Sequence, residues 1–228
     1  MPSNLVTTSS PNFDVLLSRA VPVLTAEEAA AIIVSLQDEM RGLPNCVGLA
    51  APQVGIPKAV AIVRHGGACL NLVNPSVVGG ERPFIHRGEG CMSLPGRKFD
   101  VERFGTVRIR NHILWPSPAG TVAIGDDPNH RPLERGTVPK GMSLVPVEQV
   151  YVVENPAEDC GGIVAVAVQH EIDHLEGKTL DRSPAAKEVP SKDDPKWKVG
   201  RNDPCPCGSK RDDGSPKKFK QCCLPKIS

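Results

Sequence analysis

The sequence predicts an α+β fold, in which short antiparallel or mixed sheets pack around one central helix and a small cysteine-rich module follows. The first observation is an apolar run at residues 163–168 that leads into His170-Glu171-Ile172-Asp173-His174. The second is a set of short segments with the composition and alternation of strands. The third is a group of four cysteines near the end of the chain, in a segment too short to bury a core of its own.

A first helix is predicted to begin after Thr25. Thr25 and Glu28 have the spacing of a capping box, in which each side chain accepts a hydrogen bond from the backbone of the other residue. Gly42 is expected to end the helix. The apolar residues that trace one face of it are Ile32, Ile33, Leu36 and Met40.

Four strands are expected between this helix and the apolar run. Residues 58–63 and 69–75 are rich in β-branched and aliphatic side chains, and residues 105–110 alternate cleanly between polar and apolar. A fourth strand is expected at residues 145–153. A second helix then follows from the apolar run and is expected to stop at Gly177.

The sequence His170-Glu171-x-x-His174 predicts a metal site on this second helix. Residues four apart lie on one helical face, so both imidazoles can reach one ion, and Glu171 can act on a water beside it. A charged helix that places two histidines four apart by chance is the alternative. A catalytic metal usually takes a third protein ligand. No histidine follows His174, whereas Cys91 lies upstream between a glycine and a Pro-Gly turn. A Cys/His/His set suits Fe(II) and other divalent ions, although a free cysteine is more often a small buried hydrophobe.

A third block, Gly48-Leu49-Ala50-Ala51-Pro52-Gln53-Val54-Gly55, combines small residues with one amide side chain. Small-residue runs alone usually indicate packing or turns. In order along the chain, however, G-L-A-A-P-Q-V-G, E-G-C-M-S-L-P-G and Q-H-E-I-D-H-L-E-G resemble the three signature motifs of the peptide deformylases. The resemblance covers the chain from about Pro11 to Leu180, and it implies the same α+β fold.

The resemblance implies a set of site residues. The metal ligands would be Cys91, His170 and His174, holding Fe²⁺ in the cell, with Zn²⁺, Ni²⁺ or Co²⁺ able to substitute. Glu171 would act as general base and acid, and Gln53 with the backbone N–H of Met92 would stabilise the oxyanion. Gly48 would lie against the substrate, an N-formylmethionyl nascent peptide. The residues expected to line the pocket for the methionine side chain are Val47, Val166 and Ala167.

Two features depart from the family pattern. Cys46 stands where bacterial members usually carry glycine. The distance from Cys91 to His170 is also longer than expected, which predicts an insertion at about residues 111–162 inside a catalytic domain of residues 11–182. Such an insertion is usually a surface loop or a lid. His112 and His130 lie in it, and we expect both to be exposed to solvent and to bind no metal.

The end of the chain has a different composition. From Lys187 onward there are 11 Lys and Arg against 6 Asp and Glu. Residues 183–199 are expected to form a polar linker. Residues 200–224 are similar to the SEC-C motif, a small zinc-binding module, with a longer stretch between its cysteine pairs. The expected ligands of a structural Zn²⁺ are Cys205, Cys207, Cys222 and Cys223. A disordered tail with reactive thiols is the alternative.

Composition sets the remaining expectations. The longest aliphatic run has six residues, which predicts no membrane span, and no secretory signal is recognisable. Thiols assigned as metal ligands indicate a reducing cytoplasm. The basic module favours the ribosome or an acidic protein as a partner and no sequence-specific nucleic acid. Two other functions stay open: a zinc metallopeptidase of another type, and a catalytically inactive metal-binding homologue.

Overall fold

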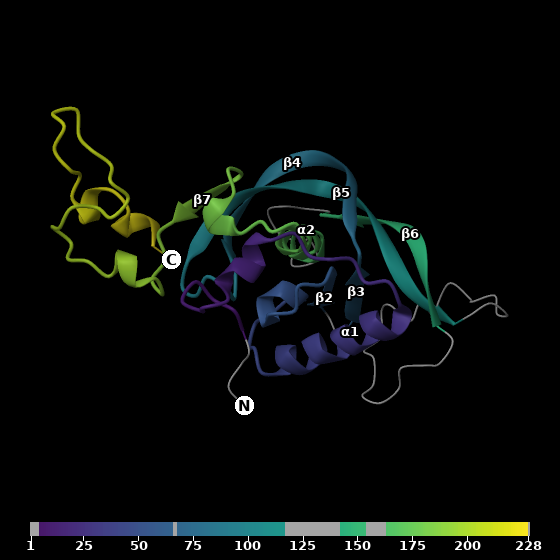
Figure 1. Cartoon of the computed structure of the whole chain (residues 1–228). Helices are drawn as coiled ribbons and strands as arrows, with labels where there is room; N and C mark the ends of the chain where they lie inside the picture. The colour runs from purple at the N-terminus through teal and green to yellow at the C-terminus, as the bar shows by residue number, and fades with distance from the viewer. Residues whose placement is uncertain (1–4, 66–67, 117–141, 154–162, 228) are drawn as a thin grey trace. The chain divides into compact units, whose positions relative to one another are not determined.

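The computed structural model describes residues 5–65, 68–116, 142–153 and 163–227. The chain forms two compact units, which are described separately. The first unit comprises Met1–Phe84 and Glu102–Thr179, and the second comprises Ile85–Val101 and Leu180–Ser228. Strands β4 (Ser76–Gly90) and β5 (Lys98–Pro116) run from one unit into the other (Figure 1).

The first unit contains a three-stranded antiparallel sheet in the order β1-β2-β3. Its strands are β1 (Gly48–Ala50), β2 (Val60–His65) and β3 (Ala68–Val73). The last two confirm the strands expected at 58–63 and 69–75, shifted by about two residues. Val60, Ala61, Ile62 and Val63 are all buried, so β2 is covered on both faces. This double burial explains why β2 reads as a continuous apolar run.

The second sheet has the order β4-β5-β6, with β7 (Ala186–Val189) also pairing with β5. In the first unit, β5 pairs antiparallel with β6 (Met142–Val152) from Thr106↔Val152 to Pro116↔Met142. The strands expected at 105–110 and 145–153 are therefore confirmed, and β5 is much longer than its alternating centre. In the second unit, β5 pairs with β7 from Lys98↔Val189 to Val101↔Ala186.

Helix α1 (Ala26–Arg41) begins and ends where the sequence predicts. The Thr25 hydroxyl accepts a hydrogen bond from Glu28 N at 3.1 Å, but the Glu28 carboxylate accepts from Leu24 N. The carboxylate also pairs with Lys58 Nζ at 2.6 Å. The capping box is therefore only half formed, because Glu28 is drawn toward a lysine that lies far away in the sequence.

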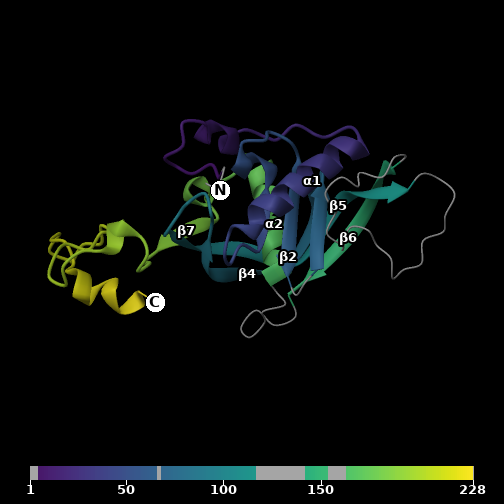
Figure 2. The same cartoon turned by 90° about the horizontal axis from the view of Figure 1, so that it is seen from below.

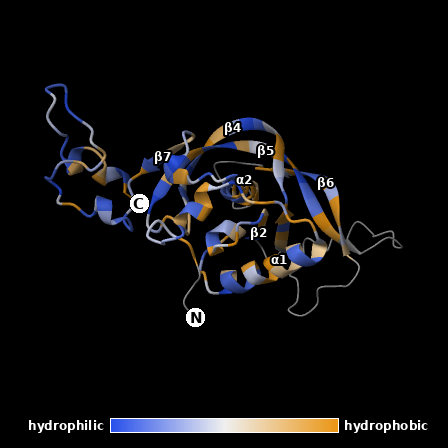
Figure 3. Cartoon of the chain, in the orientation of Figure 1, coloured by the Kyte–Doolittle hydropathy of each residue, from blue (hydrophilic) through white to orange (hydrophobic). Residues whose placement is uncertain are grey.

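Helix α2 (Ile163–Leu175) lies between the two sheets of the first unit, while α1 packs beside β2 (Figures 1 and 2). Ten of its thirteen residues are buried, so its apolar run is a core feature and not one amphipathic face. Figure 3 shows the contrast with α1, which mixes hydrophilic and hydrophobic residues. The core that joins α2 to the strands includes Ala61, Val63, Leu70, Leu72, Val107, Ile109, Ala165, Val168 and Ile172. The predicted α+β fold around a central helix is confirmed.

The span expected as an insertion, 111–162, is not loop throughout. Residues 111–116 and 142–152 belong to β5 and β6, so among the described residues this span is a ladder of paired strands. The expectation that His112 is solvent-exposed is wrong: it is half-buried on β5 with a buried Nδ1. The strand pairing places it there, which local composition does not reveal. His130 lies outside the described residues.

The second unit contains short elements and two small cores. Residues 183–199, expected as a linker, include strand β7 and the buried Trp197. One core surrounds Cys91 and includes Leu94, Phe99, Val101 and Leu180. The other consists of Trp197, Cys205, Phe219 and Cys223. Among the described residues, the first unit has the 3-10 helices η1 (Phe13–Leu17) and η2 (Ala51–Val54). The second unit has η4 (Leu180–Arg182), η5 (Pro195–Trp197), η6 (Phe219–Gln221) and η7 (Leu224–Lys226) there.

Candidate functional site

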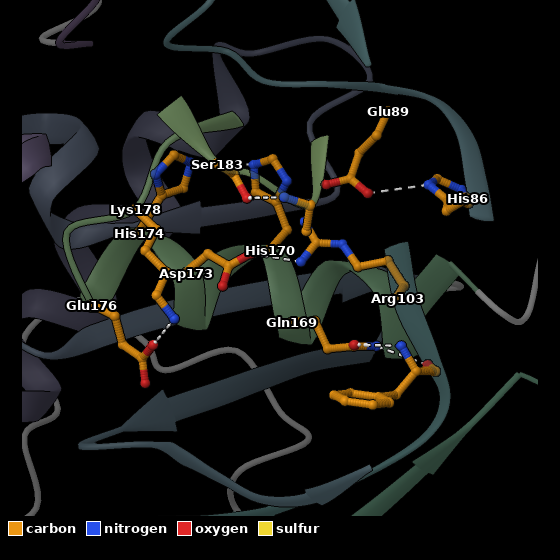
Figure 4. A network of polar contacts seen from close by, with 12 residues as sticks. His86, Glu89, Arg103, Gln169, His170, Asp173, His174, Glu176, Lys178 and Ser183 are labelled. Atoms are coloured by element: carbon orange, nitrogen blue, oxygen red, sulfur yellow. Dashed lines mark hydrogen bonds and ion pairs between the residues drawn. The ribbon is translucent and has the colours of Figure 1, made fainter. Parts of the chain in front are cut away.

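The two histidines of α2 form the centre of the candidate site. His170 and His174 lie one turn apart and are both buried. Their Nε2 atoms are 3.2 Å apart, and their rings meet edge to face with centroids 4.8 Å apart. Figure 4 shows both rings on the same side of the helix. The predicted convergence of the two imidazoles is thus present in the structure.

The separation of these nitrogens fits a shared metal ion. Two imidazole nitrogens about 2.0–2.1 Å from one tetrahedral ion lie roughly 3.3–3.4 Å from each other. The observed 3.2 Å between His170 Nε2 and His174 Nε2 is close to that range. Neutral imidazole nitrogens are common ligands of Fe(II), Zn(II), Ni(II) and Co(II). The pair can therefore supply two ligands to a divalent ion.

Glu171 lies between the histidines in sequence and packs against Gly48 of β1. It is 3% exposed. A Cβ added to Gly48 would lie 2.8 Å from Glu171 Cδ, which is closer than real Cβ contacts allow. A side chain at position 48 would therefore displace the carboxylate end of Glu171 from the place it now occupies. Cys46 donates its Sγ–H to the Gly48 carbonyl at 3.0 Å and helps to hold this strand end.

Gln53, the third residue of η2, is held in a defined orientation. Its Oε1 accepts a hydrogen bond from Ala50 N at 2.9 Å, and its backbone oxygen accepts one from Val6 N at 2.7 Å. The side chain is 1% exposed. Because the carbonyl end of the amide faces the backbone, the amide nitrogen is the end that can donate to a partner. This polarity suits an oxyanion-stabilising role.

Two polar residues that the sequence analysis did not select anchor α2 to β5 (Figure 4). Gln169 Oε1 accepts from Phe104 N at 2.8 Å, and its Nε2 donates to Phe104 O at 3.0 Å. Arg103, buried at 5% exposure, pairs with Asp173 through Nη1 and Oδ2 at 2.6 Å. These contacts fix the axial position and the rotation of the helix that carries the histidines. A polar residue inside an apolar helical run is the signal that could have indicated Gln169.

The three residues expected to line an apolar pocket have different surroundings. Ala167 belongs to the core between α2 and the sheets, and Val47 packs against this core while remaining partly exposed. Val166 is also buried, at 4% exposure, on the same helix. Their role in binding a substrate side chain stays a prediction.

Cys91 and Met92 belong to the second unit. Cys91 is buried and packs with Leu94, Phe99 and Val101. It begins a turn in which Leu94 N donates to the Cys91 carbonyl at 3.0 Å. Met92 is half-buried in this turn. The cysteine is thus carried by an ordered turn just before β5.

The four C-terminal cysteines come together as predicted. Their sulfur atoms all lie within 4.8 Å of one another. Cys207 Sγ is 3.3 Å from Cys205 Sγ and 3.5 Å from Cys222 Sγ. Burial raises the pKa of Cys205, whereas at Cys207 the hydrogen bonds from Ser209 and the neighbouring thiols outweigh burial and lower the pKa to about 6. A four-thiol group of this size can hold one tetrahedral ion.

Comparison with known proteins adds independent information. Residues 3–112 match the family model described as polypeptide deformylase. The peptide deformylase of Desulfitobacterium hafniense is 30% identical over 167 residues, which cover 72% of this chain and 84% of that protein. The peptide deformylase of Syntrophomonas wolfei is 32% identical over 167 residues, covering 72% of this chain and 83% of that protein.

Solved structures of peptide deformylases are also similar to this chain in fold. A peptide deformylase from Synechococcus elongatus, in complex with actinonin, is 28% identical with a TM-score of 0.54, and the match covers 79% of this chain and 78% of that one. The peptide deformylase from Thermotoga maritima is 25% identical with a TM-score of 0.54, covering 79% of this chain and 97% of that one. The similarity therefore extends beyond the residues of the family-model match.

Proposed function

This chain belongs to the peptide deformylase family, and we propose that the paired histidines of α2 form the centre of its reaction. The protein is a metal-dependent hydrolase that removes the N-terminal formyl group from N-formylmethionyl nascent polypeptides. The observation that carries the assignment of the site is the arrangement of His170 and His174, whose Nε2 atoms are 3.2 Å apart beside Glu171. Cys91 is proposed as the third ligand, because it occupies the cysteine position of the second family motif.

The family's chemistry gives each residue a role. When bound, a divalent ion supplies Lewis-acid activation of water near neutral pH. The Glu171 carboxylate takes a proton from the attacking water and returns it to the leaving amine of the peptide. The Gln53 amide nitrogen and the Met92 backbone N–H donate to the oxygen of the formyl carbonyl as negative charge develops on it. Gly48 keeps the space in which the Glu171 carboxylate lies.

We propose Fe²⁺ as the metal of the cell, with Zn²⁺, Ni²⁺ or Co²⁺ as substitutes. A thiolate with two imidazoles suits all four ions. Val47, Val166 and Ala167 are proposed to receive the methionine side chain, since they are the apolar residues that flank β1 and the histidine-bearing turn in sequence. A zinc metallopeptidase of another type takes its third ligand, a Glu or His, downstream of the motif, and no histidine follows His174. The nearest downstream carboxylates are engaged elsewhere, because Glu176 pairs with Lys178 and both Asp181 and Glu188 pair with Arg97. These pairings argue against that alternative.

The test is formate release from formyl-Met-Ala-Ser by the Fe(II)-loaded protein under anaerobic conditions. We expect metal-dependent formate release and no cleavage of internal peptide bonds in a protein substrate. Internal cleavage without formate would identify a peptidase. Absence of both activities in a protein that binds one ion at the histidines would identify a catalytically inactive homologue.

For the C-terminal module we propose a structural Zn²⁺ held by Cys205, Cys207, Cys222 and Cys223. All four are soft ligands within 4.8 Å of one another, a set that leaves no ligand position for water. The basic module is proposed to bind an acidic surface, either ribosomal RNA or an acidic protein. Among the described residues, none of the helices has the length and hydrophobicity needed to cross a membrane. We propose the cytoplasm, where nascent chains are made, as the location.

A further inference from the structure

The turn that carries Cys91 and the chain beyond Leu180 form one compact unit. Within the turn, Leu94 N donates to the Cys91 carbonyl at 3.0 Å, and Arg97 N donates to the Leu94 carbonyl at 3.2 Å. Two successive hydrogen bonds therefore join the backbone of Cys91 to that of Arg97. Arg97 and Cys91 are thus the two ends of one hydrogen-bonded turn.

Gly96, at the end of this turn, lies against the backbone of the chain beyond Leu180, which we call the C-terminal extension. Its φ is +78°, and a Cβ added to it would lie 2.6 Å from the carbonyl oxygen of Asp193. A side chain at position 96 would be strained and would also displace residues 193 and 194. The close approach shows that the extension is packed on the turn and does not hang free from it.

Arg97 joins the turn to the extension through its side chain. Its Nε lies 2.8 Å from Glu188 Oε1, and its Nη1 lies 3.3 Å from Asp181 Oδ2. The guanidinium carbon also lies 5.1 Å from the centre of the Phe99 ring. Arg97 thus contacts η4, β7 and β5 at once. An arginine held by two carboxylates and a ring has a defined position, unlike a lone surface ion pair.

The charges of this group stabilise one another. Burial alone lowers the pKa of Arg97, but the hydrogen bond and charge of Glu188, with those of Asp181, outweigh it and raise that pKa. At Glu188, burial raises the pKa, and the hydrogen bonds and charges of Arg97 and Lys196 outweigh it and lower the pKa. Both directions indicate that the charged forms are favoured in the folded protein.

Glu188 also forms a second ion pair, with a lysine that lies close to the cysteine module in sequence. Its second oxygen, Oε2, lies 2.7 Å from Lys196 Nζ. Lys196 Nζ lies 5.2 Å from the centre of the Trp197 ring, and Trp197 packs in the core that contains Cys205 and Cys223. Glu188 therefore bridges Arg97 of the cysteine-bearing turn and Lys196, which lies beside the tryptophan that packs against the module.

We propose that Arg97 is a positioning residue for the metal ligand Cys91, held in place by the C-terminal extension through Glu188, Asp181 and the close contact at Gly96. The proposal rests on the proposed function, in which Cys91 binds the catalytic ion. It gives residues 181–194 a role in ordering the second motif, in addition to connecting the module to the enzyme.

The test measures the order of the turn without relying on activity. In metal-free protein, the rate of alkylation of Cys91 by iodoacetamide is followed by peptide mass spectrometry, with buried Cys69 of β3 as an internal reference. Loss of charge-assisted hydrogen bonds should raise the Cys91 rate about tenfold in Arg97→Ala. Arg97→Lys should restore part of the protection, because lysine can still pair with Glu188. Glu188→Gln should raise the rate by a smaller factor, since Asp181 remains.

Arg87→Ala is the matched control, because Arg87 lies in the same unit, is largely exposed and is 3.8 Å from its partner Asp100. It should leave the Cys91 rate unchanged. An unchanged rate in Arg97→Ala would overturn the proposal. An equal rise in the alkylation rates of Cys91 and Cys69 in Arg97→Ala, Arg97→Lys and Glu188→Gln would also overturn it, because it would show that the whole protein is destabilised. If the wild-type protein releases no formate, the proposed function fails, whereas the alkylation rates still decide whether Arg97 orders the turn.

Discussion

At the residue scale, Glu171 differs from His170 and His174 because it is proposed as the proton acceptor and not as a metal ligand. Replacing Glu171 by Gln keeps the shape of the side chain but removes the proton acceptor. We expect kcat for formate release to fall by about 10²–10⁴-fold, while the metal content stays near that of the wild type, since His170 and His174 are unchanged. Metal analysis and steady-state kinetics on the same preparation check both expectations.

The control is Glu176→Gln, because Glu176 lies just past the end of α2 and forms an ion pair with Lys178 outside the histidine pair. It should have normal turnover. Near-normal turnover in Glu171→Gln would contradict the assigned mechanism. Loss of metal in that variant would instead show that the carboxylate is itself a ligand.

Gly48 gives a second prediction at this scale. Because a Cβ at position 48 would lie 2.8 Å from Glu171 Cδ, Gly48→Ala should push the carboxylate away from its position. A displacement of about 1 Å can cost roughly 100-fold in rate, so we expect a fall of that order in kcat. Gly79→Ala is the matched control, because nothing lies within 4 Å of an added Cβ there. Equal activities of the two variants would contradict the role given to Gly48.

At the scale of elements, α2 depends on Gln169 for its position on β5. Gln169→Leu would leave the partly buried backbone N–H and carbonyl of Phe104 without the amide that now bonds to them. The free energy of unfolding should fall by about 1–3 kcal/mol, measured by urea denaturation. Gln169→Glu keeps an acceptor for Phe104 N, but its other oxygen can donate to Phe104 O only when the carboxyl carries a proton, so this variant should cost less at low pH than at pH 7. A Leu variant as stable as the wild type would show that these hydrogen bonds contribute little.

The pairing of β7 with its surroundings predicts a pH dependence. The pKa of Glu188 is lowered in the folded protein, because the hydrogen bonds of Arg97 and Lys196 outweigh burial. Its stabilising contribution is therefore complete above the ordinary carboxyl pKa of about 4.3. It is lost as the pH falls through the lowered value. Glu188→Gln should lower the melting temperature at pH 7. The difference in melting temperature from the wild type should become smaller below pH of about 4. An equal difference in melting temperature at pH 7 and below pH of about 4 would contradict an ionic role for Glu188.

These elements also show what the sequence could predict. The two histidines converge because helical spacing is a local property, so the H-E-x-x-H pattern alone was sufficient to predict that they share one face of α2. Residues 58–63 were predicted as a strand because β2 is buried on both faces and therefore reads as a continuous apolar run. Residues 69–75 were predicted from the same aliphatic composition. Strand β7 was missed, because its composition is that of a polar linker and its partner, residues 98–101, lies far away in the sequence. Arg103 was missed for the same reason, since its partner Asp173 is on another element.

At the scale of the whole molecule, the C-terminal extension has two parts with different expected roles. Residues 181–194 pack on the turn of Cys91 through Glu188 and the contact of Gly96 with Asp193. The segment beyond residue 194 contains the four cysteines and the core around Trp197. The sequence predicted the second part from its cysteines, but it predicted only a linker for the first. A boundary after Asp194 therefore separates the part proposed to order the turn of Cys91 from the part proposed to bind zinc.

Truncation after Asp194 tests this division. The shortened chain keeps Glu188 and Asp193, so deformylation of a short peptide should remain nearly unchanged. About one equivalent of tightly bound zinc should be lost, because all four thiols are removed. The Cys222→Ser/Cys223→Ser double variant should lose the same equivalent in the full-length chain and change the fluorescence of Trp197, whereas Cys69→Ser should do neither. Full zinc content after truncation would refute the four-cysteine site. Loss of peptide activity with the catalytic metal retained would show that the cysteine module takes part in the chemistry.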